Sequence, residues 1–170
     1  MKKFTLIFTI ILSVVFTKNI TAQGTIVDVA AGNKDFSTLV TALKAADLVG
    51  ALQGDGPFTV FAPTNDAFAK IDAATLSSLL EEKNQKALAN ILTYHVISGK
   101  LTASDVVAAL DKGNGSVELT ALNGQVITVM QKDGKIWLKD SSENYSEIIA
   151  TDVMGSNGVI HVINTVVMPK

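Results

Sequence analysis

The two histidines, His95 and His161, are the only side chains in the sequence that ordinarily titrate near neutral pH. Either could serve as a general base or as a metal ligand. A base of this kind needs a nucleophile, yet no serine lies in a G-x-S-x-G turn and the chain has no cysteine. Zinc needs further ligands at short spacing, and the two histidines stand far apart. The sequence therefore predicts no catalytic residue, no metal site and no cofactor, and a protein that is not an enzyme.

Both histidines lie in patterns that are typical of core residues. His95 extends an apolar helical stripe through residues 87–92, so its imidazole should point inward. A buried neutral ring must find hydrogen-bond partners, and we expect those of His95 in the turn at residues 64–66. His161 alternates with apolar neighbours in a predicted strand. We interpret both as structural residues, with a direct contact role for His95 as the alternative.

Helical periodicity dominates the N-terminal half of the chain. Apolar residues within 36–43 recur at spacings of three and four, which predicts an amphipathic helix that runs to about residue 48. A second stripe begins at residues 76–80, and residues 87–95 form a third on a helix expected to end near residue 99. Thr102 followed by Asp105 is a capping signal for a short helix toward residue 110. We expect these helices to face a common core.

From Val117 onward the apolar period changes to two, which predicts strands. Asn123-Gly124 and Asp133-Gly134 separate three alternating runs, and both residues of such pairs tolerate the positive φ of a type I′ hairpin turn. A three-strand antiparallel meander is therefore expected, followed by two more strands. The predicted strands cover residues 117–121, 125–130, 135–139, 148–153 and 159–167.

Residues 59–68 read T-V-F-A-P-T-N-D-A-F and combine three structural signals. A β-branched and aromatic run halts at Pro63, which cannot donate to a strand ladder. Thr64 then offers its hydroxyl as the N-cap of a helix. The segment predicts a strand, a corner and a helix start.

The first residues have the order of a secretory signal peptide. Lys2 and Lys3 precede an apolar run at 4–16, and the segment ends in the small residue Ala22. The run is shorter than the ~20 residues that span a bilayer. We predict a signal peptide at residues 1–22 and a single domain at 23–170, with no membrane insertion after cleavage. An uncleaved membrane anchor is the alternative.

The charge pattern argues against two classes of partner. The chain has 14 basic and 16 acidic residues, and every basic residue is lysine. Proteins that read nucleic acid usually carry arginine forks and a basic face, and anionic lipid attracts clusters of basic residues. Nucleic acid and anionic membrane surfaces are therefore not expected as partners.

Three segments in this order resemble the signature motifs of fasciclin-type (FAS1) domains: residues 59–68, the Tyr94-His95 pair and residues 158–169. The resemblance covers about residues 25–169, nearly the whole predicted mature chain. It implies an α/β (α+β) domain, a bent β-sheet wedge with N-terminal helices packed on it. The motif residues taken as structural are Thr59, Phe61, Pro63, Thr64, Asn65, Asp66, Phe68 and His161.

Proteins similar to this chain are mainly extracellular or surface adhesion modules without catalysis. In animal relatives the tyrosine-histidine segment and an aspartate-isoleucine dipeptide are linked to integrin binding. The matching positions are Tyr94-His95 and Asp152-Val153, although Ala150-Thr151 replaces the Glu-Pro that those relatives often have. The resemblance implies a secreted module for cell adhesion, biofilm or host attachment, which binds a protein or extracellular polymer through Tyr94, His95, Asp152 and Val153 and could self-associate. The alternative for Tyr94 is a buried helix-end position.

A second function follows from other proteins of this type. Some in photosynthetic organisms bind carotenoids, so a carrier of a carotenoid or lipid is the alternative to adhesion. Ile148, Ile149 and residues 166–168 would line the groove of such a carrier if they are exposed. Aliphatic residues in strands of this pattern also form cores, and that interpretation stays open.

Overall fold

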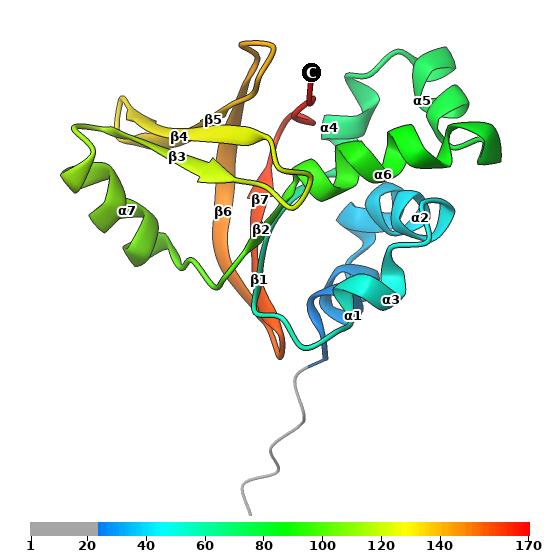
Figure 1. Cartoon of the computed structure of the whole chain (residues 1–170), viewed down its shortest axis with the longest axis horizontal. Helices are drawn as coiled ribbons and strands as arrows, with labels where there is room; N and C mark the ends of the chain where they lie inside the picture. The colour runs from blue at the N-terminus through cyan, green and yellow to red at the C-terminus, as the bar shows by residue number, and fades with distance from the viewer. Residues whose placement is uncertain (1–23) are drawn as a thin grey trace, which may run out of the picture.

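Seven strands form one bent sheet with helices on both of its sides (Figure 1). The computed structural model describes residues 24–170, and the signal peptide predicted at residues 1–22 lies outside the described residues. The helices are α1 (Ile26–Ala31), α2 (Ser37–Ala45), α3 (Val49–Leu52), α4 (Asn65–Ala69), α5 (Ala73–Leu79), α6 (Gln85–Tyr94) and α7 (Ala103–Lys112), with 3-10 turns η1 (Lys34–Phe36) and η2 (Glu82–Asn84). The strands are β1 (Phe58–Pro63), β2 (Val96–Ser98), β3 (Ser116–Thr120), β4 (Val126–Lys132), β5 (Lys135–Lys139), β6 (Tyr145–Gly155) and β7 (Gly158–Ile163).

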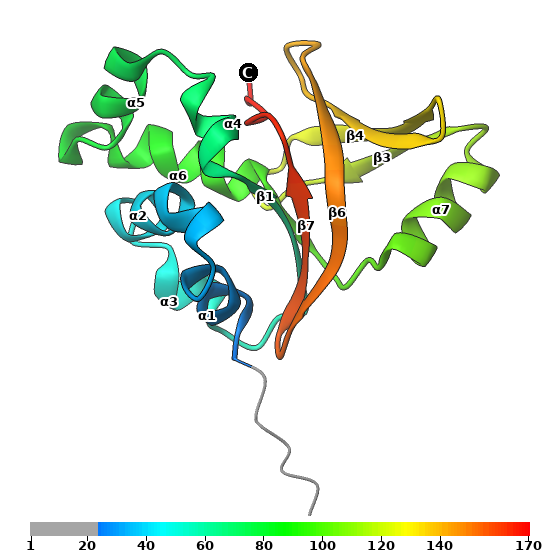
Figure 2. The same ribbon diagram turned by 180° about the vertical axis from the view of Figure 1, so that it is seen from behind.

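The sheet is bent where β6 crosses from one half of the molecule to the other. The strand order is β2-β1-β7-β6-β5-β4-β3, and β1 runs parallel to β7. Two register shifts lie between Ile148 and Val153 of β6, where Asp152 has a positive φ of 58°. Bulges bend a strand, and Figure 2 shows β6 curving beside β7. The expected bent wedge with N-terminal helices is confirmed.

The parallel strands β1 and β7 approach each other closely at one glycine. Phe58 of β1 pairs with Gly158 of β7. A Cβ atom at Gly158 would collide with the carbonyl oxygen of Phe58. The pairing of the parallel strands therefore requires glycine at this position.

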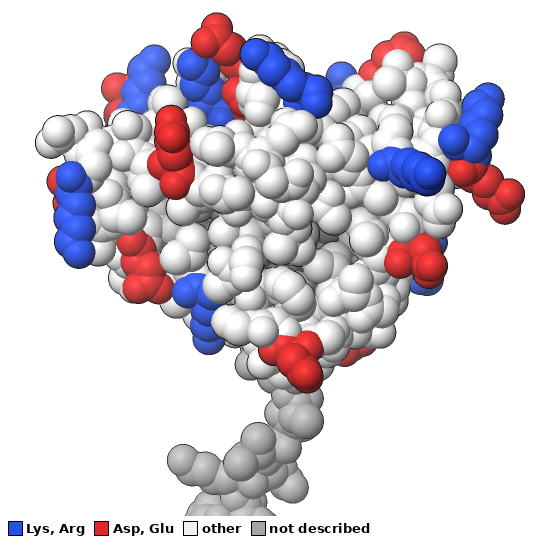
Figure 3. All heavy atoms as spheres, viewed as in Figure 1, with Lys and Arg blue, Asp and Glu red and all other residues white. Residues whose placement is uncertain are grey.

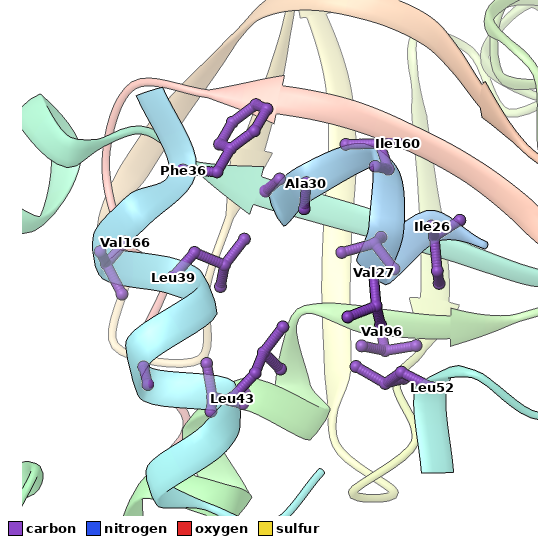
Figure 4. Close-up of a cluster of buried hydrophobic side chains, with 14 of the residues drawn as sticks. Ile26, Val27, Ala30, Phe36, Leu39, Leu43, Leu52, Val96, Ile160 and Val166 are labelled. Atoms are coloured by element: carbon purple, nitrogen blue, oxygen red, sulfur yellow. The ribbon is translucent and has the colours of Figure 1, made fainter. Parts of the chain in front are cut away.

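The helices α1 to α6 bury one apolar cluster against β1 and β7. Leu39 and Leu43 of α2 point toward Val27 of α1 and Ile160 of β7 (Figure 4). Each such side chain contributes roughly 1.5–3 kcal/mol when it is buried. Thr25 and Asp28 form a capping box at the start of α1 that the sequence analysis missed. None of the helices in residues 24–170 has the length and apolar character needed to cross a bilayer.

A second cluster fills the inside of the wedge. Val106 and Leu110 of α7 pack there with Ile127 and Val129 of β4 and Leu138 of β5. The alternate residues of β4 and β5 consequently face outward. The strands β3 to β6 are called the hairpin strands below, and α7 covers their inward face.

The structure departs from the predicted elements at four points. The helix expected to end near residue 99 ends at Tyr94, because residues 96–98 form the strand β2. The helix expected to reach residue 48 ends at Ala45, because Asp47 adopts a positive φ of 57°. Asp133 and Gly134 both have positive φ as expected, but at Asn123-Gly124 only the glycine does, so the type I′ turn predicted there was wrong. The last strand ends at Ile163 and not at residue 167, because side chains bind the backbone N–H groups beyond it.

Candidate functional site

The predicted strand, corner and helix start at residues 59–68 are present as β1 and α4. Thr59 is fully buried, and its hydroxyl donates to the Gly99 carbonyl at 2.7 Å. The same oxygen accepts the N–H of Leu101 at 2.8 Å. Thr59 therefore fixes the segment that leads from β2 into α7.

The aromatic and corner residues of this segment act in packing and capping. Phe61 and Phe68 are 0% and 4% exposed, and Pro63 pairs with Ile163 at the end of β1. The hydroxyl of Thr64 accepts the N–H of Ala67 at 3.2 Å. Thr64 is thus the N-cap that the sequence predicted.

Asn65 joins this corner to the first helices. Its Oδ1 atom accepts the N–H of Thr38 at 3.0 Å, and its Nδ2 atom donates to the Lys34 carbonyl at 2.8 Å. Asp66 is exposed in the first turn of α4, where a negative charge is favourable. Asn65 therefore holds the first helices to this corner, whereas Asp66 is exposed to solvent.

Tyr94 is fully buried in the cluster inside the wedge. Its hydroxyl donates to the Val126 carbonyl at 2.8 Å and accepts the N–H of Ser141 at 3.1 Å. A buried tyrosine usually needs such partners for its polar end. Tyr94 consequently links α6 to β4 and to the turn between β5 and β6.

His95 is 2% exposed and is held on both ring nitrogens. Nδ1 lies 2.8 Å from the Ile91 carbonyl, to which it donates, and Nε2 accepts the N–H of Val167 at 3.2 Å. This pattern requires the neutral ring. Burial lowers the pKa of His95 to about 4, although the Ile91 carbonyl and nearby Asp140 act in the opposite direction. The partners expected in the turn at residues 64–66 were wrong, because that turn is occupied by helix capping.

The structure brings His161 and Asp152 together. His161 is 1% exposed, its Nε2 donates to the Leu101 carbonyl at 2.8 Å, and its Nδ1 accepts the N–H of Asp152 at 3.4 Å. Its ring lies 5.9 Å from that of Phe61, centroid to centroid. The carboxylate of Asp152 accepts the N–H of Ala103 at 2.8 Å, at the start of α7. Asp152, which lies in the irregular part of β6, therefore binds the first turn of α7.

The four residues predicted to bind a partner are all engaged within the fold. Tyr94 and His95 are buried, Asp152 caps α7, and Val153 packs against the helical cluster. Tyr94 and His95 do not reach the surface, whereas Asp152 and Val153 are half-buried, and a binding role for these four residues stays a prediction.

The arrangement of motifs and sheet matches a known family. A family model described as the fasciclin domain matches residues 34–169. The chain belongs to the fasciclin family. It is 52% identical over 145 residues to protein sll1483 of Synechocystis sp., which covers 85% of this chain and 73% of that protein. It is 33% identical over 153 residues to the cell surface glycolipoprotein MPB83 of Mycobacterium bovis, which covers 87% of this chain and 62% of that protein.

A solved structure confirms the fold. The FAS1 domain pair from the insect cell adhesion molecule Fasciclin I matches with a TM-score of 0.73 and 21% sequence identity. The match covers 84% of this chain and 50% of that chain. The expected FAS1 fold is therefore established for this fasciclin chain.

Asp140 holds the end of this fasciclin domain and was missed by the sequence analysis. It is 4% exposed, and Oδ1 accepts the N–H groups of Ser142 and Asn144 at 2.8 and 2.9 Å. Its Oδ2 accepts the N–H of Met168 at 2.9 Å. The local pattern Asp-Ser-Ser-Glu-Asn is typical of an Asx turn and could have indicated the first role but not the second.

Asn157 is a second polar anchor that the sequence did not single out. Its Oδ1 accepts the N–H of Ile26 at 2.9 Å, and its Nδ2 donates to the carbonyls of Leu52 and Gly54, each at 2.8 Å. One side chain in the turn between β6 and β7 thus fixes the start of α1 and the end of α3. These partners lie far away in the sequence.

The groove expected for a carrier of apolar ligands is not formed by the residues named for it. Val166 and Val167 are buried, Ile148 and Met168 pack against the two clusters, and only Ile149 of this set is exposed. The apolar space among α1, α2 and the sheet has a volume of about 20 Å³, enough for about one water molecule. A carotenoid could enter it only if the helices moved. Across residues 24–170 no three His, Cys, Asp or Glu side chains gather as metal ligands.

Charges of both signs are interspersed on the face of this fasciclin domain that Figure 3 shows. In the face shown in Figure 3, lysines and acidic residues alternate around the margin, and the centre is formed by uncharged residues. A surface of this kind creates no strong field of one sign.

Proposed function

We propose that this fasciclin domain is a non-catalytic adhesion module that acts outside the cell or at its surface, in cell adhesion, biofilm formation or host attachment. The similarity to a cell surface glycolipoprotein and to a domain pair from a cell adhesion molecule supports this function. The two histidines that could perform acid-base chemistry are buried and hydrogen-bonded to backbone groups. Their arrangement serves the fold and leaves neither ring open to a substrate.

The observation that carries the proposal is the outward face of the hairpin strands. Val126 and Tyr145 are 41% and 51% exposed on this face, whereas the exposed Ile149 of β6 lies apart from them, beside Asp35 and the corner at residues 64–66. Exposed apolar and aromatic side chains that share a sheet face are typical of contact surfaces. The partner in this proposal is a protein or an extracellular polymer, or a second copy of the chain.

The residues first predicted to bind a partner have an indirect role in this proposal. Tyr94, His95, Asp152 and Val153 hold the wedge together, and their replacement would disturb adhesion by loosening the fold. Variants at Tyr94 and Asp152 should therefore lose adhesion only in proportion to the fraction of protein that unfolds. Loss of adhesion by a fully folded Asp152→Asn variant would show instead that the aspartate contacts the partner.

Export is the second part of the proposal and rests on the signal-peptide pattern at residues 1–22. Protein recovered from the envelope or medium of the producing cells should begin near Gln23 by intact-mass measurement. Recovery of a chain that starts at Met1 in the cytoplasm would contradict export.

Deletion of the gene tests the adhesion function directly. The deletion strain should attach less to surfaces than the parent strain, and the wild-type gene should restore attachment. A complementing Val107→Ala variant is a suitable control, because Val107 is exposed on α7, away from the hairpin face. Unchanged attachment of the deletion strain, with a carotenoid or lipid on the purified protein, would favour the carrier function.

A further inference from the structure

The outward face of β4, β5 and β6 places three large side chains next to one another. Met130 pairs directly with Trp137, and Trp137 pairs with Glu147 of β6. Tyr145 pairs with Lys139, so it lies diagonally across from Trp137, within reach for an aromatic ring. The inward positions between them are Leu138 and Ser146, both fully buried. Met130, Trp137 and Tyr145 therefore share the face that α7 leaves uncovered.

These side chains line a groove at the turn between β4 and β5. The groove has a volume of about 240 Å³ and is completed by Lys132 and Asp133. This volume is below the ~300–1,000 Å³ of sites that enclose a whole small molecule. Tyr145 is 51% exposed, so the groove opens to solvent. It can hold one ring of a longer chain whose neighbouring units extend over the sheet.

The charged groups around the groove neutralise one another. Lys135 contacts Glu147 at 2.7 Å, and Lys139 contacts Glu143 at 3.0 Å. At the groove itself, Lys132 and Asp133 place opposite charges side by side. A strongly anionic or cationic partner would gain little from such a surface. The lining suits a neutral ligand with both apolar faces and many hydrogen-bonding groups.

We propose that this groove binds one sugar residue of a neutral polysaccharide. A pyranose ring presents an apolar C–H face that stacks on flat aromatic rings, and Trp137 and Tyr145 provide such rings. Its hydroxyl groups both donate and accept, which matches the ammonium of Lys132 and the carboxylate of Asp133. A lipid chain has no polar groups along its length and so cannot form hydrogen bonds with the exposed Lys132 and Asp133. The site rests on the adhesion function and names the polymer that it would hold.

In this proposal the aromatic and the charged side chains of the groove contact different parts of the sugar. Tyr145 and Trp137 bury the ring faces, and Met130 fills the floor beside Trp137, with which it is paired. Lys132 and Asp133 set the orientation of the hydroxyl groups. Aromatic anchors of this kind usually carry much of the binding free energy at an interface.

Trp137 is the only tryptophan in the chain, so its fluorescence reports on this groove alone. The purified protein is titrated with three neutral polymers, hydroxyethylcellulose, dextran and galactomannan, and with alginate and phosphatidylglycerol vesicles for comparison. At least one neutral polymer should shift the emission of Trp137 to shorter wavelength, because the sugar excludes water from the indole. No shift and no retardation in gels that contain any of the three neutral polymers would overturn the proposal. Binding of alginate or vesicles alone would also overturn it.

Variants then test whether the groove is the binding site. Tyr145→Ala should weaken binding about tenfold, as loss of an aromatic anchor does, and Tyr145→Phe should retain most of it. Trp137→Phe keeps a ring but removes the fluorophore, so its binding is measured by gel retardation and should be weakened less than that of Tyr145→Ala. Val107→Ala, at an exposed apolar position on α7 away from the groove, should bind like the wild type. Equal affinities of Tyr145→Ala and Val107→Ala would contradict the assignment.

Failure of this site and failure of the adhesion function give different results. Cells with Tyr145→Ala should attach as poorly as the deletion strain if the groove holds the polymer. Wild-type attachment of these cells, beside a deletion strain that attaches poorly, would reject the groove and retain adhesion. A deletion strain that attaches normally would reject adhesion, whereas polymer binding by the purified protein would still decide the groove.

Discussion

Tyr94 and Tyr145, the two tyrosines of the chain, lie on opposite faces of the hairpin layer. Tyr94 is fully buried and its hydroxyl bonds to the backbone of β4, whereas Tyr145 is 51% exposed on the outward face. The first belongs to a motif that identifies the family, and the second belongs to none. The comparison teaches that the family motif marks residues that build the fold, and that a contact surface must be sought where the sheet leaves aromatic rings outside.

The largest difference should come from truncating the two tyrosines. Tyr94→Ala removes a buried ring and leaves the Val126 carbonyl and the Ser141 N–H without a partner. We expect it to lower the free energy of unfolding by about 3–5 kcal/mol. Urea unfolding followed by Trp137 fluorescence measures this loss. A Tyr94→Ala variant as stable as Tyr145→Ala would break the comparison.

Truncation of the buried His95 side chain should also destabilise the fold. His95→Ala opens a cavity and leaves the Val167 N–H and the Ile91 carbonyl without their side-chain partner. The free energy of unfolding should fall by about 2–4 kcal/mol, as measured in urea. A variant that unfolds like the wild type but no longer supports attachment would instead make the histidine a contact residue.

The buried ring of His95 also predicts a pH dependence. Burial lowers its pKa from 6.5 to about 4 in the folded protein, so the unfolded chain binds a proton first as pH falls. The neutral ring contributes fully to the free energy of unfolding above pH 6.5. This contribution is lost as the pH falls from about 6.5 to 4, a loss of roughly 3 kcal/mol. His95→Gln, which cannot titrate, should lack this part of the loss. Equal slopes for both proteins over that range would contradict the prediction.

Asp152 should have a smaller effect because it caps one helix. Asp152→Ala removes the acceptor for the Ala103 N–H and puts alanine at a positive φ of 58°. We expect a loss of about 1–2 kcal/mol in the free energy of unfolding. Asp152→Asn keeps an oxygen acceptor and tolerates the same backbone conformation, so it should unfold close to the wild type. Thermal unfolding of the pair measures the difference.

The smallest effect on stability is expected at Tyr145. Its ring is half exposed and fills no cavity in the core, so Tyr145→Ala should change the free energy of unfolding by less than about 0.5 kcal/mol. Chemical denaturation beside the wild type measures this change. A loss of the size expected for Tyr94→Ala would mean that the outward ring supports the fold, and would remove the contrast between the two faces.

The sequence predicted those elements whose signals are local. The alternation of residues 117–139 and the Asp133-Gly134 pair predicted the meander, and Thr64 and Thr102 predicted two helix starts. The anchors Asn157 and Asp140 were not predicted, because their backbone partners lie in distant segments and no local pattern encodes them. The groove was also missed. Apolar residues occupy both faces of β4, so periodicity alone could not decide which face is buried.

The position of β7 has a consequence for the order of folding. This strand lies between β1 and β6, and its parallel pairing joins Phe58 to Gly158, on the order of 100 residues apart. The centre of the sheet therefore cannot close until nearly all of the described chain has been synthesised. Contacts of such long range close slowly, because the loop entropy is lost before the strands pair. A chain that remains unfolded until its last strand has been synthesised can be translocated across a membrane before it folds.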